Sequence, residues 1–328
     1  MKTDNLPRFH LAEMNTPLEK MHKLAADLGG PGLLIKRDDL TGLAMGGNKI
    51  RKLEFLIGDA LSRGADAVIT AGGAQSNHCR LTAAAAVRAG LGCELVLSGS
   101  PPDLPNGNLL LDHLFGACVT WCSRDEREAQ MESVAEALRT KGKKPYVIPV
   151  GGSNEIGTVG YVLAIEELMH QLSEKRLSAD YVVVASSSGG TQAGLTLGAD
   201  VYGYSGKILG ISIDQVKTGE SAFPPVMARI AKATADRIGT TCELHEKDFL
   251  LNCDYLGAGY AIPGDREREA IEMTSRLEGI LLGPVYTGRA MGGLIDLVRK
   301  GFFKPDETVV FWHTGGTPEL FAYNHEFL

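Results

Sequence analysis

A lysine at the start of an amphipathic segment is the first residue of this sequence that could do covalent chemistry. The stretch "AMGGNKIRKLEF" places Lys49, Arg51 and Lys52 directly after a glycine pair, where the apolar spacing predicts the start of a helix. At about 100° per residue, Lys49 falls on the apolar face, Arg51 opposite that face and Lys52 at its edge. We therefore expect Lys49 to point inward, and Arg51 and Lys52 to be solvated or to contact a partner.

An inward lysine has a chemical consequence, although the pattern also allows an ordinary explanation. Burial removes water from the ammonium group, lowers its pKa and makes the neutral amine available as a nucleophile or for Schiff-base formation. Alternatively, the side chain of Lys49 runs along the helix end and keeps its ammonium group in water. This stretch alone leaves both interpretations open.

The strongest local signal is a glycine-rich loop after a β-branched strand, in "VVVASSSGGTQAGLTLG". Ser188 is followed by Gly189 and Gly190, which permit close backbone approach, and Thr191 begins a helix whose first N–H groups point back at the loop. Such a loop can hold a phosphate. The loop fits neither GxxxxGK[ST] nor GxGxxG, so it supports neither a nucleoside triphosphate nor a dinucleotide. A tight turn without a ligand is the alternative.

A second loop, "ITAGGAQSNHCR", repeats this arrangement of strand, glycine pair and helix. Ser76 is placed to cap the helix, with Asn77 and His78 in its first turn. The backbone N–H groups and the side chains of Ser76 and Asn77 could hold a second anion, such as the carboxylate of an amino acid. Capping explains Ser76 equally well, and a single histidine is commonly structural.

Polar residues also follow strand-like segments nearer the C-terminus. The segment "LGPVYTGRAMGG" supplies Tyr286 and Thr287, and "VVFWHTGGTPEL" supplies His313 and Thr314. Tyr260 lies in the glycine-rich segment "GAGYAIPG". These groups could line the mouth of a binding site, or they could belong to ordinary turns.

Strand-like and helical stretches alternate along most of the chain. This alternation would place the loops described above at the ends of strands. Examples are "LLIKRD" before a helix over 48–63, "AVITAG" before "SNHCRLTAAAAVRAG", and "CVTWC" before a helix over 125–140. This alternation predicts parallel strands joined by crossover helices, with ligands beyond the carboxyl ends of the strands. The segment "PVGGSNEIGTVG" is a candidate hinge between two α/β halves.

Composition narrows the function further. The chain has 328 residues, 44% hydrophobic and 22% charged, with a formal net charge of −7, which argues against nucleic-acid or anionic-membrane partners. We find no signal-like or membrane-spanning segment and expect a cytoplasmic protein. Six cysteines without a CxxC pair suit reduced thiols, and "CVTWC" alternates like a strand, so no metal site is expected.

A Schiff-base lysine and a phosphate cradle at different strand ends together indicate a phosphorylated aldehyde. That is the chemistry of pyridoxal 5′-phosphate (PLP). Lys49 would then point inward because it binds the cofactor.

Five segments in order resemble the 1-aminocyclopropane-1-carboxylate (ACC) deaminase / D-cysteine desulfhydrase family of fold-type II PLP enzymes. They are "KRDDLTGLAMGGNKIRKLEFLIGDAL", "TAGGAQSNHCR", "SSSGGTQAGL", "GPVYTGRAMGGL" and "HTGGTPELFAY". The resemblance implies the tryptophan-synthase β-subunit-like α/β fold, with two open, twisted, mostly parallel sheets and flanking helices. It also implies a large PLP-binding domain over 1–48 and 162–328, a small domain over 49–161, and a homodimer.

The resemblance also implies roles for individual residues. Lys49 would be the Schiff-base lysine and the base at Cα, Asn77 would contact the 3′-oxygen of the cofactor, and the segment 188–191 would hold its phosphate. Thr314 would approach the pyridine nitrogen, where a hydroxyl moderates the electron sink and suits β-elimination.

On the substrate side, the resemblance assigns the carboxylate to Ser76, Asn77 and His78, and the side chain and leaving group to Tyr260 and Tyr286. His78 and Thr287 follow the desulfhydrase pattern, since ACC deaminases typically have Gln and Glu there. Gly283 and Arg289 depart from the usual Asp and Lys and leave the substrate open.

We therefore expect a PLP-dependent lyase that converts D-cysteine, a small amino acid, to pyruvate, ammonia and hydrogen sulfide. L-Cysteate, ACC, D-serine and β-chloro-D-alanine are alternative substrates in the same class. Two alternatives of other classes are a nicotinamide-dependent oxidoreductase and a non-catalytic carrier of amino acids or PLP.

Overall fold

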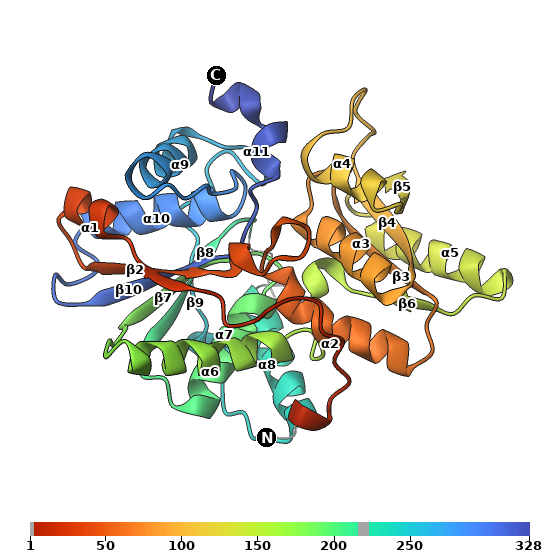
Figure 1. Cartoon of the computed structure of the whole chain (residues 1–328), viewed down its shortest axis with the longest axis horizontal. Helices are drawn as coiled ribbons and strands as arrows, with labels where there is room; N and C mark the ends of the chain where they lie inside the picture. The colour runs from red at the N-terminus through yellow and green to blue at the C-terminus, as the bar shows by residue number, and fades with distance from the viewer. Residues whose placement is uncertain (1–2, 216–222) are drawn as a thin grey trace.

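The computed structural model describes residues 3–215 and 223–328 and contains two β-sheets. Figure 1 shows the six-stranded sheet on the left and the four-stranded sheet on the right. All strand pairs are parallel except the pair of β1 with β2. This confirms the predicted α/β fold with two mostly parallel sheets and flanking helices.

The larger sheet lies between two layers of helices. Its strands, in spatial order, are β1 (Leu18–Lys20), β2 (Gly32–Arg37), β10 (Thr308–His313), β7 (Tyr181–Ser186), β8 (Lys207–Ser212) and β9 (Leu250–Asn252). The upper layer in Figure 1 holds α1 (His22–Leu28), α9 (Asp265–Glu278) and α10 (Thr287–Arg299). The lower layer holds α6 (Val159–Glu174), α7 (Gly190–Tyr202) and α8 (Phe223–Ile238). The short helix α11 (Glu319–Ala322) follows β10.

Burial on both faces explains the β-branched strands of this sheet. Along β7 and β10, Val183 and Phe311 pack into the core under α9 and α10, whereas Val182, Val184 and Val310 pack against α6 and α7. Successive strand residues point to opposite faces, so a strand covered by helices on both sides must be apolar at every position.

The smaller sheet is built from the middle of the chain. Its strands, in spatial order, are β5 (Cys118–Cys122), β4 (Gly92–Ser98), β3 (Ala67–Gly73) and β6 (Pro145–Val147). The helices of this part are α2 (Lys49–Ser62), α3 (Asn77–Ala89), α4 (Gly107–Leu114) and α5 (Arg127–Thr140). These strands lie within the range predicted for a small domain, whose boundaries at 49 and 161 stay a prediction.

The edge strands β1 and β9 were not predicted from the sequence. Each has three residues, which is too short for a readable alternation, and β1 is the one strand that runs antiparallel. Helix α2 begins at Lys49, one residue after the predicted start.

The prediction that Arg51 is solvated was wrong. Arg51 is 4% exposed, and its guanidinium donates to Asp38 at 2.8 and 2.9 Å and to Glu167 at 2.8 and 2.9 Å. Tyr161 and Trp312 also donate to Asp38, at 2.6 and 2.7 Å. Burial alone would raise the pKa of Asp38, but Arg51 outweighs it and lowers that pKa to about 2.

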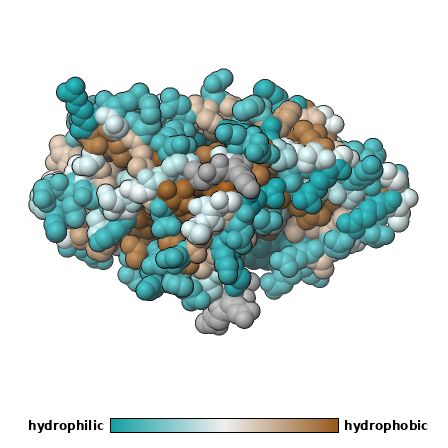
Figure 2. Space-filling model, turned by 90° about the horizontal axis from the view of Figure 1, so that it is seen from below, coloured by the Kyte–Doolittle hydropathy of each residue, from teal (hydrophilic) through white to brown (hydrophobic). Residues whose placement is uncertain are grey.

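The outer surface carries mainly hydrophilic residues on the face in Figure 2, with hydrophobic residues gathered toward its middle. Among the described residues, no helix combines the length and the apolar character needed to cross a membrane.

The six cysteines are free thiols, and the described residues contain no cluster of His, Cys, Asp or Glu suited to a metal ion.

We predict that Asp38→Asn lowers the free energy of unfolding by about 3–5 kcal/mol, because Arg51 would keep its buried charge without its main partner. Urea-induced unfolding measures this change. Glu19→Gln is the control, since the Arg37–Glu19 ion pair is half exposed at its carboxylate and should contribute about 1 kcal/mol or less. A loss no larger for Asp38→Asn than for the control would contradict the role of the buried pair.

Candidate active site

Lys49 begins α2 and is partly buried. Its Nζ donates to Asn48 Oδ1 at 2.8 Å. Burial is the main cause that lowers the pKa of Lys49 to about 8; the negative charge of Glu319 opposes this shift and the positive charge of Arg80 adds to it. The structure therefore favours the inward orientation over the solvated one, and a substantial fraction of the side chain is a neutral amine near pH 8.

The loop before α7 has the form of an anion cradle. Gly189 adopts φ +81°, in the left-handed region, and lets the chain turn into α7 at Gly190. Ser188 Oγ lies 2.7 Å from Ser153 Oγ, which also accepts from the Gly190 N–H at 3.3 Å. The Thr191 hydroxyl accepts from Asn48 at 3.1 Å, so the cradle and the start of α2 are directly connected.

Lys52 also faces this cradle, contrary to the prediction that it lies at a solvated edge. The residue is 1% exposed, and its Nζ donates to Ser153 Oγ and to the Gly151 carbonyl, each at 3.1 Å. Burial lowers the pKa of Lys52 well below its usual value, and the charge of Lys49 adds to this effect. No carboxylate accepts a hydrogen bond from Lys52 in the described structure, so an anion in the cradle would supply the missing countercharge.

The loop before α3 brings a second set of donors to Lys49. Ser76 caps the helix as predicted, because its Oγ accepts from the Cys79 N–H at 3.2 Å. Its hydroxyl hydrogen is thus still available to a ligand. Asn77 is 8% exposed and its Nδ2 donates to Glu319.

His78 is held as a neutral ring. Its Nε2 lies 2.8 Å from the Thr70 hydroxyl, which itself donates to the Ile148 carbonyl at 2.9 Å. The single hydroxyl hydrogen is then used, so Nε2 is the donor to Thr70, and Nδ1 has no hydrogen-bond partner among the described residues. Burial lowers the pKa of His78 well below its usual value, with Lys49 and Lys52 adding to this. A contact of this ring with a substrate carboxylate stays a prediction.

Two buried charged residues beside Lys49 were missed from the sequence. Arg80 donates from Nη2 to the Gly46 carbonyl at 3.0 Å and from Nη1 to the Ala44 carbonyl, which fixes the loop before α2. Glu319, at the start of α11, is fully buried, and burial raises its pKa to about 8. An acid in the first turn of a helix looks like an ordinary surface residue in a sequence, so nothing marked it out.

Tyr260 and Tyr286 are brought together as a pair. Their hydroxyl oxygens are 2.6 Å apart and their rings meet edge to face, with centroids 6.1 Å apart. Burial raises the pKa of both hydroxyls, so they remain protonated at neutral pH. The guanidinium of Arg124 lies over the Tyr260 ring, 5.2 Å from its centroid, and forms an ion pair with Asp214.

Packing explains the two departures from the family pattern. Arg289 is 1% exposed, donates to Glu267 at 2.6 Å, and donates to the carbonyls of Gly259 and Ile262 on either side of Tyr260. It therefore fixes the Tyr260 loop. A side-chain carbon on Gly283 would lie within 2.9 Å of the Gly316 backbone, so no larger residue fits.

The loop after β10 closes the site from the other side. The Thr314 carbonyl accepts from the Asn48 N–H at 3.0 Å, which places Thr314 next to the start of α2. Thr287 Oγ lies 2.7 Å from the Gly283 nitrogen and donates to the Gly315 carbonyl at 3.1 Å, so it ties two loops together. His313 Nε2 lies 3.0 Å from the Leu281 carbonyl oxygen, so its ring contacts the backbone and has a structural role.

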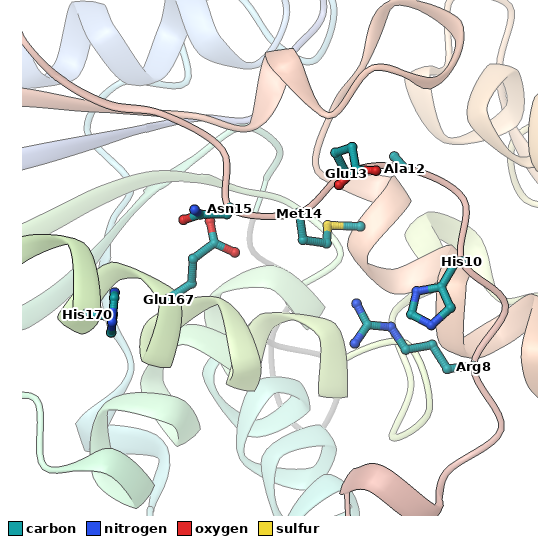
Figure 3. Close-up of a pocket in the computed structure, with 8 residues that line it drawn as sticks. All are labelled: Arg8, His10, Ala12, Glu13, Met14, Asn15, Glu167 and His170. Carbon is teal, nitrogen blue, oxygen red and sulfur yellow. The ribbon is translucent and has the colours of Figure 1, made fainter.

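A separate cavity of about 630 Å³ lies between the N-terminal segment and α6 (Figure 3). Two of its charged lining residues are already paired: Arg8 with Glu54, and Glu167 with Lys36 and Arg51. None of the predicted site residues lines it.

Comparisons with known proteins relate this chain to one enzyme family. The family model described as "Pyridoxal-phosphate dependent enzyme" matches residues 10–315. A crystal structure titled as an ACC deaminase homologue is 39% identical, with a TM-score of 0.90, and the match covers 98% of this chain and 96% of that one. A pyridoxal 5′-phosphate-dependent aspartate racemase, 18% identical with a TM-score of 0.67 and coverage of 92% and 90%, shares the fold.

We predict that Lys52→Met weakens the binding of inorganic phosphate to the cofactor-free protein by roughly tenfold or more, because a hydrogen bond to a charged group is lost. The phosphate-dependent rise in melting temperature, compared between wild type and variant, measures this. Lys300→Met, at an exposed helix end, is the control and should bind phosphate like the wild type. An undiminished phosphate response in Lys52→Met would contradict the assignment of the cradle.

Proposed function

This chain belongs to the family of pyridoxal-phosphate dependent enzymes, and we propose that it is a lyase that converts D-cysteine to pyruvate, ammonia and hydrogen sulfide. One observation carries the proposal: Lys49, with a pKa lowered to about 8, follows Asn48, which donates to Thr191 in the anion cradle. The buried Glu319 acts on the charge of Lys49 and also on the paired hydroxyl groups of Tyr260 and Tyr286. This arrangement can hold the cofactor, move a proton at Cα and receive a leaving group at Cβ.

The described residues fit the cofactor. The loop 188–191 and the buried amine of Lys52 would bind the phosphate, since they combine N–H donors, hydroxyl groups and a lysine without a carboxylate partner. Lys49 would bond the aldehyde carbon, Asn77 would donate to the 3′-oxygen, and Thr314 would lie near the pyridine nitrogen. When bound, the cofactor withdraws electrons from Cα, which makes the α-proton acidic and allows a group at Cβ to leave.

Lys49 would accept the proton at Cα of the substrate. Because burial keeps much of this side chain neutral near pH 8, it can take the α-proton without first losing one to bulk water. The Ser76 hydroxyl and the first N–H groups of α3 would hold the substrate carboxylate and so orient the Cα–H bond toward Lys49.

Tyr260 and Tyr286 would surround the substrate side chain. One hydroxyl donates to the other, so the pair keeps one hydrogen for a substrate atom. Arg124 and Arg289 would position this pair, the first through its contact with the Tyr260 ring and the second through the backbone on both sides of Tyr260.

The choice of D-cysteine over related substrates is supported by Thr287. Its hydroxyl is engaged with the backbone of Gly283 and Gly315, so this position offers no titratable group to the substrate. The likeness to an ACC deaminase homologue keeps ACC as the second candidate. L-Cysteate is a third, with sulfite as the leaving group.

Family membership argues against the nicotinamide alternative, and turnover distinguishes an enzyme from a non-catalytic carrier. We keep the homodimer and the cytoplasmic location as proposals.

We predict rapid release of sulfide and pyruvate in equal amounts from D-cysteine, and little from L-cysteine, because a fixed carboxylate and a single base on one face select one enantiomer. Lead acetate or methylene blue detects sulfide, and lactate dehydrogenase coupling detects pyruvate. ACC and L-cysteate assayed in parallel identify the substrate within the family.

Lys49→Ala should lower turnover on the order of a thousandfold or more, whereas Lys300→Ala should leave it unchanged. Full turnover in Lys49→Ala would contradict the proposed mechanism. Turnover of ACC or L-cysteate alone would retain the mechanism and change the substrate.

A further inference from the structure

Glu319 is a buried acid beside Lys49 that the proposed function leaves without a role. It is fully buried at the start of α11, and its Oε1 accepts from Asn77 Nδ2. Its Oε2 has no hydrogen-bond partner among the described residues. The backbone amide of Val285 is near enough to lower the pKa of Glu319 but lies outside ordinary hydrogen-bonding geometry. One carboxyl oxygen is therefore fixed and the other is free.

The orientation of Asn77 determines which oxygen is fixed. Its Oδ1 accepts from Asn108 Nδ2 at 2.9 Å and faces Arg80 Nη2 at 3.4 Å, so its Nδ2 must point to Glu319. The other carboxyl oxygen, Oε2, lies 3.5 Å from where a side-chain carbon on Gly316 would be, a space that the glycine keeps open.

Glu319 is linked electrostatically to both the proposed base and the tyrosine pair. Its charge acts on titratable groups from every side of the site: Lys49 on α2, Arg80 on α3, Tyr260 in its loop, Tyr286 before α10, and Tyr323 after α11. Of the acids in the described structure, Glu319 is the one whose charge shifts the pKa of Lys49. Asn77, which donates to Glu319, is also the residue proposed to contact the 3′-oxygen of the cofactor, so Glu319 adjoins the proposed binding site.

The carboxyl group holds its proton at neutral pH, because burial raises its pKa to about 8. Since Oε1 accepts from Asn77, the proton resides on Oε2. An acid is most effective when its pKa is near the working pH, which favours Glu319 over the tyrosine hydroxyls, whose pKa values are raised by burial.

We propose that Glu319 is the general acid of the elimination and protonates the departing group through Oε2. This inference rests on the proposed function. As the Cβ–S bond of D-cysteine breaks, sulfur leaves with the bonding electrons as hydrosulfide, and the O–H bond of Glu319 breaks to give hydrogen sulfide. The α-proton taken by Lys49 then passes to the Glu319 carboxylate, which restores both residues.

Glu319→Gln tests this role with two substrates that differ in the leaving group. Hydrosulfide needs a proton as it departs, whereas chloride from β-chloro-D-alanine does not. We expect kcat/KM for D-cysteine to fall by about 10²–10⁴-fold, with less than about a threefold change for β-chloro-D-alanine. Glu326→Gln, the same substitution outside the site, should change neither value.

The outcomes separate this inference from the proposed function. Equal losses on both substrates would show that Glu319 only maintains the structure, and would overturn the general-acid role alone. A wild-type protein inactive on both substrates would overturn the proposed function and this role with it.

Thermal unfolding of the purified protein supplies a readout independent of turnover. A carboxyl group whose pKa rises from 4.5 to about 8 on folding stabilises the fold below pH 4.5 and loses that contribution as the pH rises through 8. The melting temperature of Glu319→Gln, relative to wild type, should therefore increase between pH 5 and pH 8.5. A constant difference over this range would mean that Glu319 is ionised, and would overturn the proposal.

Discussion

Three basic residues lie within the first four residues of α2, with Arg51 and Lys52 buried and Lys49 partly buried, and the surrounding structure must compensate for them. Each cation is compensated differently. Arg51 is neutralised by the carboxylates of Asp38 and Glu167, which tie α2 to the large sheet and to α6. Lys52 donates only to neutral acceptors. Among the acids of the described structure, only Glu319 shifts the pKa of Lys49. The residue with full compensation, Arg51, joins parts of the fold, whereas Lys49 and Lys52 are the two that we propose to bind the cofactor.

Close backbone packing brings the residues of the proposed site together from distant parts of the chain. A side-chain carbon on Gly315 would lie 2.9 Å from the Gly47 Cα, and one on Gly316 would lie 3.2 Å from the Gly283 Cα. Three loops can therefore meet at Lys49 only because glycine occupies these positions. The hydrogen bonds of Asn77 and Thr287 then fix the loops in register, which holds the site residues in place for catalysis.

The sequence was sufficient for those parts of the site that depend on local structure. The start of α2, the Ser76 cap and the glycine loop before α7 each depend on a local sequence of about a dozen residues. It was insufficient where burial depends on distant partners. A helical-wheel argument assumes one buried face, whereas α2 packs against α3, α6 and the 3₁₀ turn Val150–Gly152, and its residues 50–60 are all buried. Glu319 became visible only once α11 was placed beside Asn77, 242 residues away.

The central claim is that Lys49, and not Lys52, bonds the cofactor. Both amines have a lowered pKa, so Lys52 is a true competitor three residues away. Borohydride reduction of the purified protein, digestion and fragment-ion mass spectrometry would locate the bound cofactor. We expect the mass of reduced pyridoxal phosphate on Lys49 alone. The same mass on Lys52, or on neither residue, would contradict the account.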